Sequence, residues 1–251
     1  MANSTTGDST LDRLVRVLSA FDAHAPSMSV GALASAAQLP VATTYRLVNQ
    51  LIGHDFLRKD PSGNVRLGLG LWEVASRSSS APDLREAAKP FMEDIQAVVA
   101  QHTQLAVLRD DEVLFIERLS SRESVVNQAR IAGRLPAHRT SVGVVLLAFS
   151  PPHVQEAYFA DHPQTLPPDG TGGGELRKVL AQARAQGYTA LDGLIDEETT
   201  GIAVPVLGRG ATAVAALGIV VPRQDGNVHT FLPVLMTGAR GIARAMGSTP
   251  L

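Results

Sequence analysis

The segment from Pro40 to Arg46 carries small, hydroxyl-bearing, aromatic and cationic side chains at the start of an expected helix. A helix reads base edges in the major groove when its first turns carry small or polar side chains, while cations and hydroxyl groups hold the phosphates. We expect the first turn to lie nearest the bases and Arg46 to contact a phosphate or a guanine. The residues expected to contact double-stranded DNA are Val41, Ala42, Thr43, Thr44, Tyr45, Arg46, Arg58, Lys59 and Arg66.

The last three of these cations belong to an expected β-hairpin. Two short runs, Phe56–Lys59 and Val65–Leu67, flank the segment Asp60–Asn64, whose composition is typical of a turn. A hairpin directly after a helix-turn-helix is a wing, and cations on a wing reach the DNA backbone. The hairpin therefore strengthens the prediction of DNA binding.

Three short helices would position the DNA-reading segment. Ser9 can cap the first helix, which is expected to run to about Ala23, with Asp12 completing a capping box. The third helix is expected to begin near Pro40 and to end at Gly53, where a left-handed cap fits. Amphipathic three-helix segments are also common in other proteins. The alternative is therefore a sensor or scaffold that acts by protein contacts without specific DNA binding.

The composition indicates two cores, no disulfide and no membrane span. The chain has 251 residues, 45% of them hydrophobic, and no cysteine. A net charge of −2 gives no broad positive field, so DNA binding must come from a local patch. No apolar run approaches the roughly 20 residues that cross a bilayer, and nothing near the start resembles an export signal. We expect a cytoplasmic protein that contacts no membrane.

Other reactive side chains do not complete a catalytic or metal site. Four carboxylates lie between Asp192 and Glu198, but no histidine or nucleophile accompanies them, so a solvated loop is expected. The seven histidines are scattered, with no i, i+4 pair beside an acid. The run Gly172–Gly174 lies in a proline-rich loop and not between a strand and a helix, as a phosphate-binding loop would. The sequence predicts no enzyme, no cofactor and no metal.

The chain is expected to divide into two domains. We predict a winged helix-turn-helix over residues 1–68, a linker helix and hinge over 69–82, and a second domain over 83–251. Consecutive hairpins with helices packed beside them favour an α+β fold with an antiparallel sheet for the second domain. Its expected strands lie near 104–109, 112–119, 124–131, 188–191, 200–207 and 212–221. Its expected helices lie near 83–101, 140–149, 151–160, 175–186 and 228–245, with a mobile loop over 163–174.

Several spaced motifs follow one another along nearly the whole chain. They are Leu11–Leu18, Leu39–Val48, Phe56–Gly68, Gly133–His138, Gly143, Gly187-Tyr188 and Ile202–Val206. In this order they resemble the isocitrate-lyase-regulator (IclR) family of bacterial transcription factors. The resemblance implies a GAF/profilin-type effector domain and a homodimer or homotetramer. It also implies binding to a pseudo-palindromic operator, as a repressor rather than as an activator.

The resemblance also implies a site for a small carboxylate between the sheet and the helix that follows Leu135-Pro136. Backbone N–H groups at the start of that helix, those of Ser141 and Val142, would hold the carboxylate. His138 lies just before them and would contact the ligand, or alternatively form a buried structural hydrogen bond. The residues expected to bind the effector are Asn127, Leu135, His138, Thr140, Ser141, Val142, Leu191, Asp192, Gly201, Gly218 and Val220.

The chain departs from the family pattern at both sites. Relatives often carry a lysine and a serine at the positions of Val41 and Ala42, so this chain favours an apolar contact there, such as one to a thymine methyl. Relatives also often carry thiol or hydroxyl groups at the positions of Gly201, Gly218 and Val220. Their loss predicts a wider, more apolar pocket and an effector such as an aromatic acid or a related amide. The alternative is that the two glycines only relieve crowding between strand and helix.

Overall fold

The computed structural model describes residues 8–22, 25–78, 80–122, 124–125, 127, 129–162, 173–225 and 227–247. The chain divides into two compact units, Met1–Ser79 and Ser80–Leu251. The division falls within the segment 69–82, which the sequence predicts as a linker helix and hinge. Each unit has a hydrophobic core of its own.

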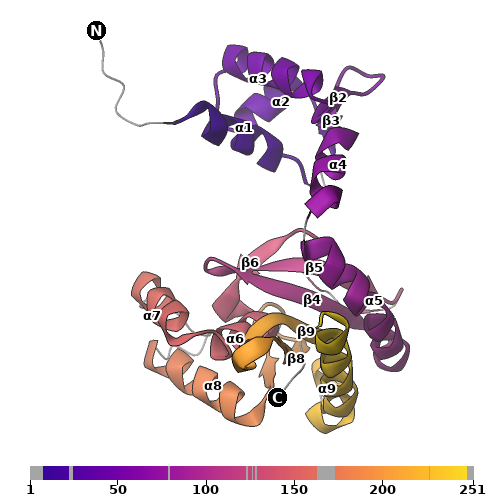
Figure 1. The fold of residues 1–251 in the computed structure, drawn as a ribbon, viewed down its shortest axis with the longest axis vertical. Helices are drawn as coiled ribbons and strands as arrows, with labels where there is room; N and C mark the ends of the chain where they lie inside the picture. The colour runs from indigo at the N-terminus through magenta and orange to yellow at the C-terminus, as the bar shows by residue number, and fades with distance from the viewer. Residues whose placement is uncertain are drawn as a thin grey trace. The chain divides into compact units, whose positions relative to one another are not determined.

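The first unit packs helices against a three-stranded antiparallel sheet (Figure 1). Its elements are α1 (Thr10–Ser19), β1 (Ser27–Met28), α2 (Val30–Ala36), α3 (Val41–Gly53), β2 (Leu57–Lys59), β3 (Val65–Leu67) and α4 (Leu69–Ser78). Aliphatic side chains of the first three helices and of the β2–β3 hairpin meet in one core, among them Val17, Leu33, Leu47, Leu57 and Val65. The predicted helix-turn-helix with its wing is confirmed.

A capping box sets the start of α1. Ser9 Oγ accepts from the backbone N–H of Asp12 at 3.1 Å, and Asp12 Oδ2 accepts from the backbone N–H of Ser9 at 2.9 Å, which confirms the capping box. The prediction that this helix runs to about Ala23 is wrong, because it ends at Ser19. Beyond the helix, Asp22 Oδ1 accepts the backbone N–H of Ala25 at 2.8 Å, and an aspartate that accepts from nearby backbone competes with helical hydrogen bonding.

Aspartate side chains organise the end of α3 and the wing. Helix α3 ends at Gly53, as predicted, but the left-handed residue is Asp55, with φ 56°, and not the glycine. In the turn between β2 and β3, Asp60 Oδ1 accepts two backbone N–H groups at 2.9 and 3.0 Å. Its Oδ2 accepts from Ser27 Oγ at 2.6 Å, which ties the short strand β1 to the wing. The sequence pattern did not predict β1, because a strand of two residues shows no periodicity.

The second unit is a six-stranded antiparallel sheet with helices on both faces (Figure 1). Its helices are α5 (Ser80–Val99), α6 (Ser141–Ala148), α7 (Pro152–Asp161), α8 (Gly173–Gln186) and α9 (Val228–Ala245). Its strands are β4 (His102–Arg109), β5 (Glu112–Ser120), β6 (Arg134–Pro136), β7 (Thr189–Asp192), β8 (Thr199–Leu207) and β9 (Ala213–Pro222), in the order β6-β5-β4-β9-β8-β7. The predicted α+β fold with an antiparallel sheet is confirmed.

In the central strands β4, β9 and β8, the two faces of this sheet carry side chains of different size. Large side chains such as Ile202 and Val204 pack against α5 and α9. Between them in the strand, Ala203 faces α6 and α8 with Ala106 and Ala216. Small residues on that face let α6 approach the sheet closely enough for all eight of its residues to be buried. This close approach places the start of α6 beside the strands.

One predicted strand of the second domain is wrong. The described residues of the segment 124–131 form no strand, and β6 (Arg134–Pro136) pairs with β5 instead. Side chains rather than a neighbouring strand hold this segment: Gln101 Oε1 accepts from Val125 N at 3.0 Å, and Arg118 donates to the carbonyl of Asn127 at 3.3 Å. The other predicted strands and helices agree with the observed ones apart from shifts at their ends. Most of the predicted loop, residues 163–172, lies outside the described residues.

Candidate functional site

Helix α3 exposes most of the predicted DNA-reading side chains. Val41 is 59% exposed and Tyr45 is 52% exposed. Ala42 and Arg46 are also exposed, and Thr43 is partly exposed. These side chains are accessible to a partner along the first turns of the helix.

Thr44 is the exception, and its predicted contact with DNA is wrong. The residue is 0% exposed, and its hydroxyl donates to the carbonyl of Pro40 at 3.2 Å. Its spacing places it on the same face as Leu47 and Val48, which belong to the core of the first unit. Thr44 therefore packs the helix rather than reading DNA.

The wing adds a second group of cations. Arg58 and Arg66 stand directly opposite each other in the β2–β3 register, and both are exposed. Lys59 Nζ lies 5.9 Å from the centre of the Tyr45 ring, so a cation–π contact joins the wing to α3. Within the described part of the chain, Arg46, Arg58 and Arg66 form no salt bridge, which leaves their guanidinium groups available for phosphates.

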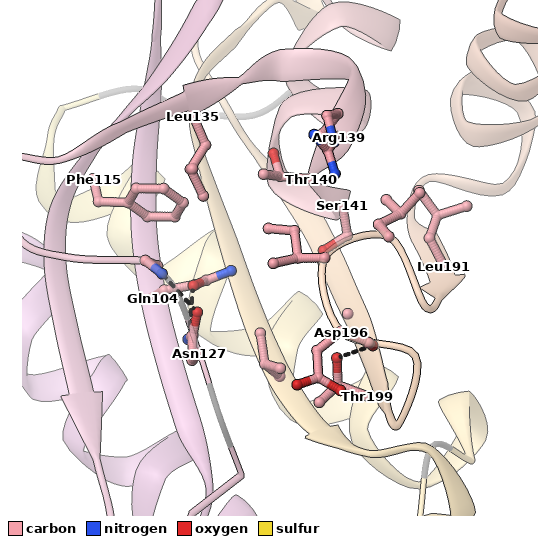
Figure 2. Close-up of a pocket in the computed structure, with 15 residues that line it drawn as sticks. Gln104, Phe115, Asn127, Leu135, Arg139, Thr140, Ser141, Leu191, Asp196 and Thr199 are labelled. Carbon is pink, nitrogen blue, oxygen red and sulfur yellow. Dashed lines mark hydrogen bonds between the residues drawn. The ribbon is translucent and has the colours of Figure 1, made fainter. Parts of the chain in front are cut away.

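A pocket opens in the second unit between the sheet and the start of α6 (Figure 2). Side chains from β4, β5, β8 and β9, from the segment before β6 and from the segment between β7 and β8 form its walls. The lining residues are Gln104, Phe115, Asn127, Ala129, Leu135, Arg139, Thr140, Ser141, Leu191, Leu194, Ile195, Asp196, Thr199, Gly201 and Val220.

The structure brings together seven of the eleven predicted effector residues. Those that line the pocket are Asn127, Leu135, Thr140, Ser141, Leu191, Gly201 and Val220. Among the described residues, four predicted ones do not line it: His138, Val142, Asp192 and Gly218. Their own contacts explain why.

The side chain of Val142 occupies the space that a side chain at position 218 would need. A Cβ built on Gly218 would lie 2.6 Å from Val142 Cγ1, so the missing side chain makes room for α6 and not for a ligand. At Gly201 a Cβ would lie 2.6 Å from Ser141 Oγ. Gly201 therefore both borders the pocket and lets the start of α6 approach β8. For Gly218 the alternative of relieved crowding holds, and its predicted place in the pocket is wrong.

His138 and Asp192 are occupied by neighbouring side chains. His138 Nδ1 lies 2.6 Å from Tyr158 Oη, and the same hydroxyl oxygen accepts the backbone N–H of His138 at 3.1 Å. Burial lowers the pKa of His138 and raises the pKa of Tyr158. Asp192 Oδ1 accepts from Thr200 Oγ1 at 2.5 Å, and its Oδ2 lies 3.6 Å from Arg223 Nε. The structural alternative for His138 therefore fits its geometry.

The start of α6 gives one side of the pocket a positive character. Thr140 Oγ1 accepts the N–H of Gly143 at 2.9 Å, which caps the helix. The helix geometry leaves the N–H groups of Ser141 and Val142 without an intrahelical acceptor. Arg139 lines the pocket next to them. An anion on this side would meet a guanidinium and the positive end of the helix dipole.

Sequence reasoning missed several lining residues, among them Gln104, Phe115, Asp196 and Thr199. Gln104 could have been predicted as a site residue, because it lies in a strand of mostly apolar residues, where a buried amide needs a hydrogen-bond partner. Residues between β7 and β8, such as Leu194 and Ile195, carried none, since nothing local shows that this segment folds over the sheet.

The described residues contain no group of three or more metal-ligating side chains that could hold an ion. No described helix is long and apolar enough to cross a membrane.

Comparisons with known proteins agree with this architecture. The family model for the bacterial transcriptional regulator IclR C-terminal domain matches residues 77–245, and that for the IclR helix-turn-helix domain matches residues 10–61. The regulator XynR of Escherichia coli (strain K12) is 27% identical over 244 residues, which cover 94% of this chain and 96% of XynR. The repressor AllR of Salmonella typhimurium is 27% identical over 256 residues, which cover 97% of this chain and 92% of AllR.

One solved structure shows the same likeness at higher identity. It is an IclR homolog from Microbacterium hydrocarbonoxydans in complex with 4-hydroxybenzoate. That protein is 42% identical to this chain, with a TM-score of 0.87, and the match covers 95% of this chain and 99% of the other. The chain belongs to the IclR family of bacterial transcriptional regulators, with a DNA-binding helix-turn-helix domain and a ligand-sensing effector domain.

Proposed function

We propose that this chain is a cytoplasmic repressor that senses a small aromatic carboxylic acid. It binds a pseudo-palindromic operator as a homo-oligomer, and the occupied pocket favours one spacing of the two recognition helices, which changes operator affinity. The observation that carries the proposal is the pocket beside α6, which joins a cationic edge to apolar walls.

The pocket chemistry supports an aromatic carboxylate. Arg139 and the start of α6 suit a carboxylate, and Phe115 and Leu135 offer apolar surface to a ring. The Microbacterium relative, 42% identical, was solved with 4-hydroxybenzoate, an acid of this class. An oxoacid of two or three carbons would leave these apolar walls without contact.

The first unit supports DNA binding by an oligomer. The exposed side chains of α3 and the unpaired arginines of the wing suit base edges and phosphates. Large apolar side chains on α1 and α4 remain exposed, with Leu11 at 67% and Trp72 at 68%. Exposed apolar groups of this size often mark a contact with another protein molecule. The relative AllR, which is named a repressor, supports the direction of regulation.

Fluorescence anisotropy of the full chain on DNA from its own upstream region tests the proposal. Binding is measured across a salt series, with benzoate, 4-hydroxybenzoate, glyoxylate and pyruvate added in turn. We expect tight, salt-sensitive and sequence-selective binding that only the aromatic acids change. The variant Arg46→Ala should lose this selectivity without a change in unfolding, whereas Arg77→Ala, on α4, should keep it.

Two results would contradict different parts of the proposal. A response to the oxoacids alone would rule out the aromatic effector and leave the regulator. Weak binding that ignores sequence, together with unchanged binding by Arg46→Ala, would favour the scaffold that acts by protein contacts alone.

A further inference from the structure

Gln104 presents the NH₂ group of its side-chain amide to the pocket. The residue lies on β4 and is only 3% exposed. Its Oε1 accepts a hydrogen bond from Asn127 Nδ2 at 3.3 Å. Its Nε2 has no hydrogen-bond partner in the part of the chain that the structure describes, and Figure 2 shows this nitrogen directed away from Asn127 into the pocket. A ligand in the pocket would cover this donor, and a covered donor without an acceptor is costly. A ligand that accepts from it should therefore bind more tightly than one that does not.

The backbone determines which end of this amide faces the pocket. The N–H of Ala129 can only donate, and it donates to Asn127 Oδ1 at 2.9 Å. Asn127 must therefore turn Nδ2 toward Gln104, and Gln104 must meet it with its oxygen. The NH₂ group of Gln104 is then the end that remains for a ligand. This chain of donors and acceptors fixes the hydrogen-bond polarity of the pocket, because an amide turned the other way would set two donors or two acceptors against each other.

The segment that carries Asn127 is itself held in place. Arg118 donates to the carbonyl of Asn127 at 3.3 Å and also to the carbonyl of Ala129. These two bonds fix the backbone that carries the side chain of Asn127, and through it the position of the Gln104 amide. The donor of Gln104 is part of a positioned site, as a specificity-determining group must be.

We propose that Gln104 selects effectors that carry an oxygen acceptor on the ring, at the end away from the carboxylate. This inference rests on the proposed function and names the substituent that the pocket recognises. Arg139 and Ser141 lie on one side of the pocket and Gln104 on another, as Figure 2 shows. A benzoate held by its carboxylate near α6 thus directs its ring substituent toward the amide. The ligand class is a hydroxy- or carbonyl-substituted benzoate.

The discrimination has a simple physical origin. A ring methyl group fills the same space as a hydroxyl group but leaves the buried amide donor unpaired. A ring amino group presents hydrogens to the Gln104 hydrogens, so two donors meet. The effector site therefore rejects both analogues although their size and carboxylate are the same.

Isothermal titration calorimetry of the full chain tests this inference with 4-hydroxybenzoate, 4-methylbenzoate and 4-aminobenzoate. We expect the wild-type chain to bind the hydroxy acid about tenfold more tightly than either analogue. In Gln104→Met, which keeps the side-chain length, the hydroxy and methyl acids should bind within about twofold of each other, because no donor remains.

A second variant inverts the polarity. In Asn127→Asp, the new carboxylate still accepts from Ala129 but can no longer donate, so Gln104 turns its NH₂ toward it and its oxygen into the pocket. In this variant, 4-aminobenzoate should bind about tenfold more tightly than 4-methylbenzoate, a preference that is not expected of the wild-type chain.

Gln96→Met is the matched control. The amide of Gln96 donates from Nε2 to Gln101 O at 2.8 Å and to Ser121 Oγ at 2.9 Å, and its Oε1 accepts from Thr103 Oγ1 at 2.8 Å. Its loss should lower the melting temperature and leave the ratio of ligand affinities unchanged.

The outcomes separate this inference from the proposed function. Equal binding of the hydroxy and methyl acids by the wild-type chain, or a preference that survives in Gln104→Met, overturns the role of Gln104 and leaves an aromatic effector. If no benzoate binds while glyoxylate or pyruvate does, the proposed function is wrong and this inference with it. If Gln104→Met fails to fold by circular dichroism, the wild-type series and Asn127→Asp decide.

Discussion

Removal of the Arg58 guanidinium tests whether the wing contacts DNA phosphates. Arg58 is exposed on β2, opposite Arg66 on β3, and forms no salt bridge within the described residues. Because its side chain supports no other group of the first unit, Arg58→Ala should change DNA binding without a measurable change in the free energy of unfolding.

The size of the effect follows from counterion release. Each phosphate contact contributes about 0.9 to the slope of log K against log salt concentration. Two copies of Arg58 in a homodimer would therefore reduce the slope by about 1.8 when both are removed. Between 50 and 200 mM salt, the ratio of wild-type to Arg58→Ala affinity should shrink by roughly twelvefold, which is a fourfold salt change raised to the power 1.8.

Fluorescence anisotropy on operator and on unrelated DNA measures both slopes. Arg58→Ala should weaken the two by similar factors, because phosphates carry no base identity. Arg77→Ala is the control: Arg77 lies on α4 and its guanidinium is 3.5 Å from Glu73, so its removal should leave the slope unchanged. An unchanged slope in Arg58→Ala, or a loss confined to operator DNA, would refute the placement of the wing on the backbone.

Three further predictions concern the second unit. Burial lowers the pKa of His102 below about 6.5, so the neutral imidazole is favoured in the folded state. Its contribution to the free energy of unfolding should be fully present above that pH and should be lost as the pH falls through the lowered pKa. His102→Gln should flatten this dependence in urea titrations at pH 7.5 and 5. Gly218→Ala should cost roughly 1–3 kcal/mol of stability by the same assay, because its Cβ would lie 2.6 Å from Val142 Cγ1. Arg85→Met should lower the free energy of unfolding by about 1–3 kcal/mol, because it leaves the buried carboxylate of Glu117 without its cation. In the folded chain, Glu117 Oε2 lies 2.6 Å from Arg85 Nε. Adding Glu117→Gln should recover most of this stability in a double-mutant cycle.

Local signals predicted the helices and the wing because the groups that create them are close in sequence. The capping box of Ser9 and Asp12 spans three residues, and the apolar spacing of Leu47, Val48 and Leu51 lies within one helix. Thr44 shows the limit of such signals. A hydroxyl group is consistent with a DNA contact or with a bond to the preceding turn, and only the packing of α3 against the core decides for the turn.

The pocket was predicted less completely than the fold because its walls come from distant segments. The residues implied by family resemblance reached the right region, but Gly218 faces Val142 and not the cavity. Phe115 and Leu194 have no sequence feature that relates them to each other or to α6. Both line the pocket because β5 and the segment after β7 contribute to its walls, although they are far apart in the sequence and are not neighbours in the sheet.

The wrong strand prediction near 124–131 and the polarity of the pocket have one physical cause. In a strand, the N–H of Ala129 would pair with a neighbouring strand, and the side chain of Asn127 would be fixed by the alternation of the pleat. Because Arg118 holds the carbonyls of this segment instead, the N–H of Ala129 is left to the side chain of Asn127. That bond orients Asn127 and, through it, the amide of Gln104. An irregular segment pinned by one arginine thus gives the pocket a directed donor that a regular strand would not.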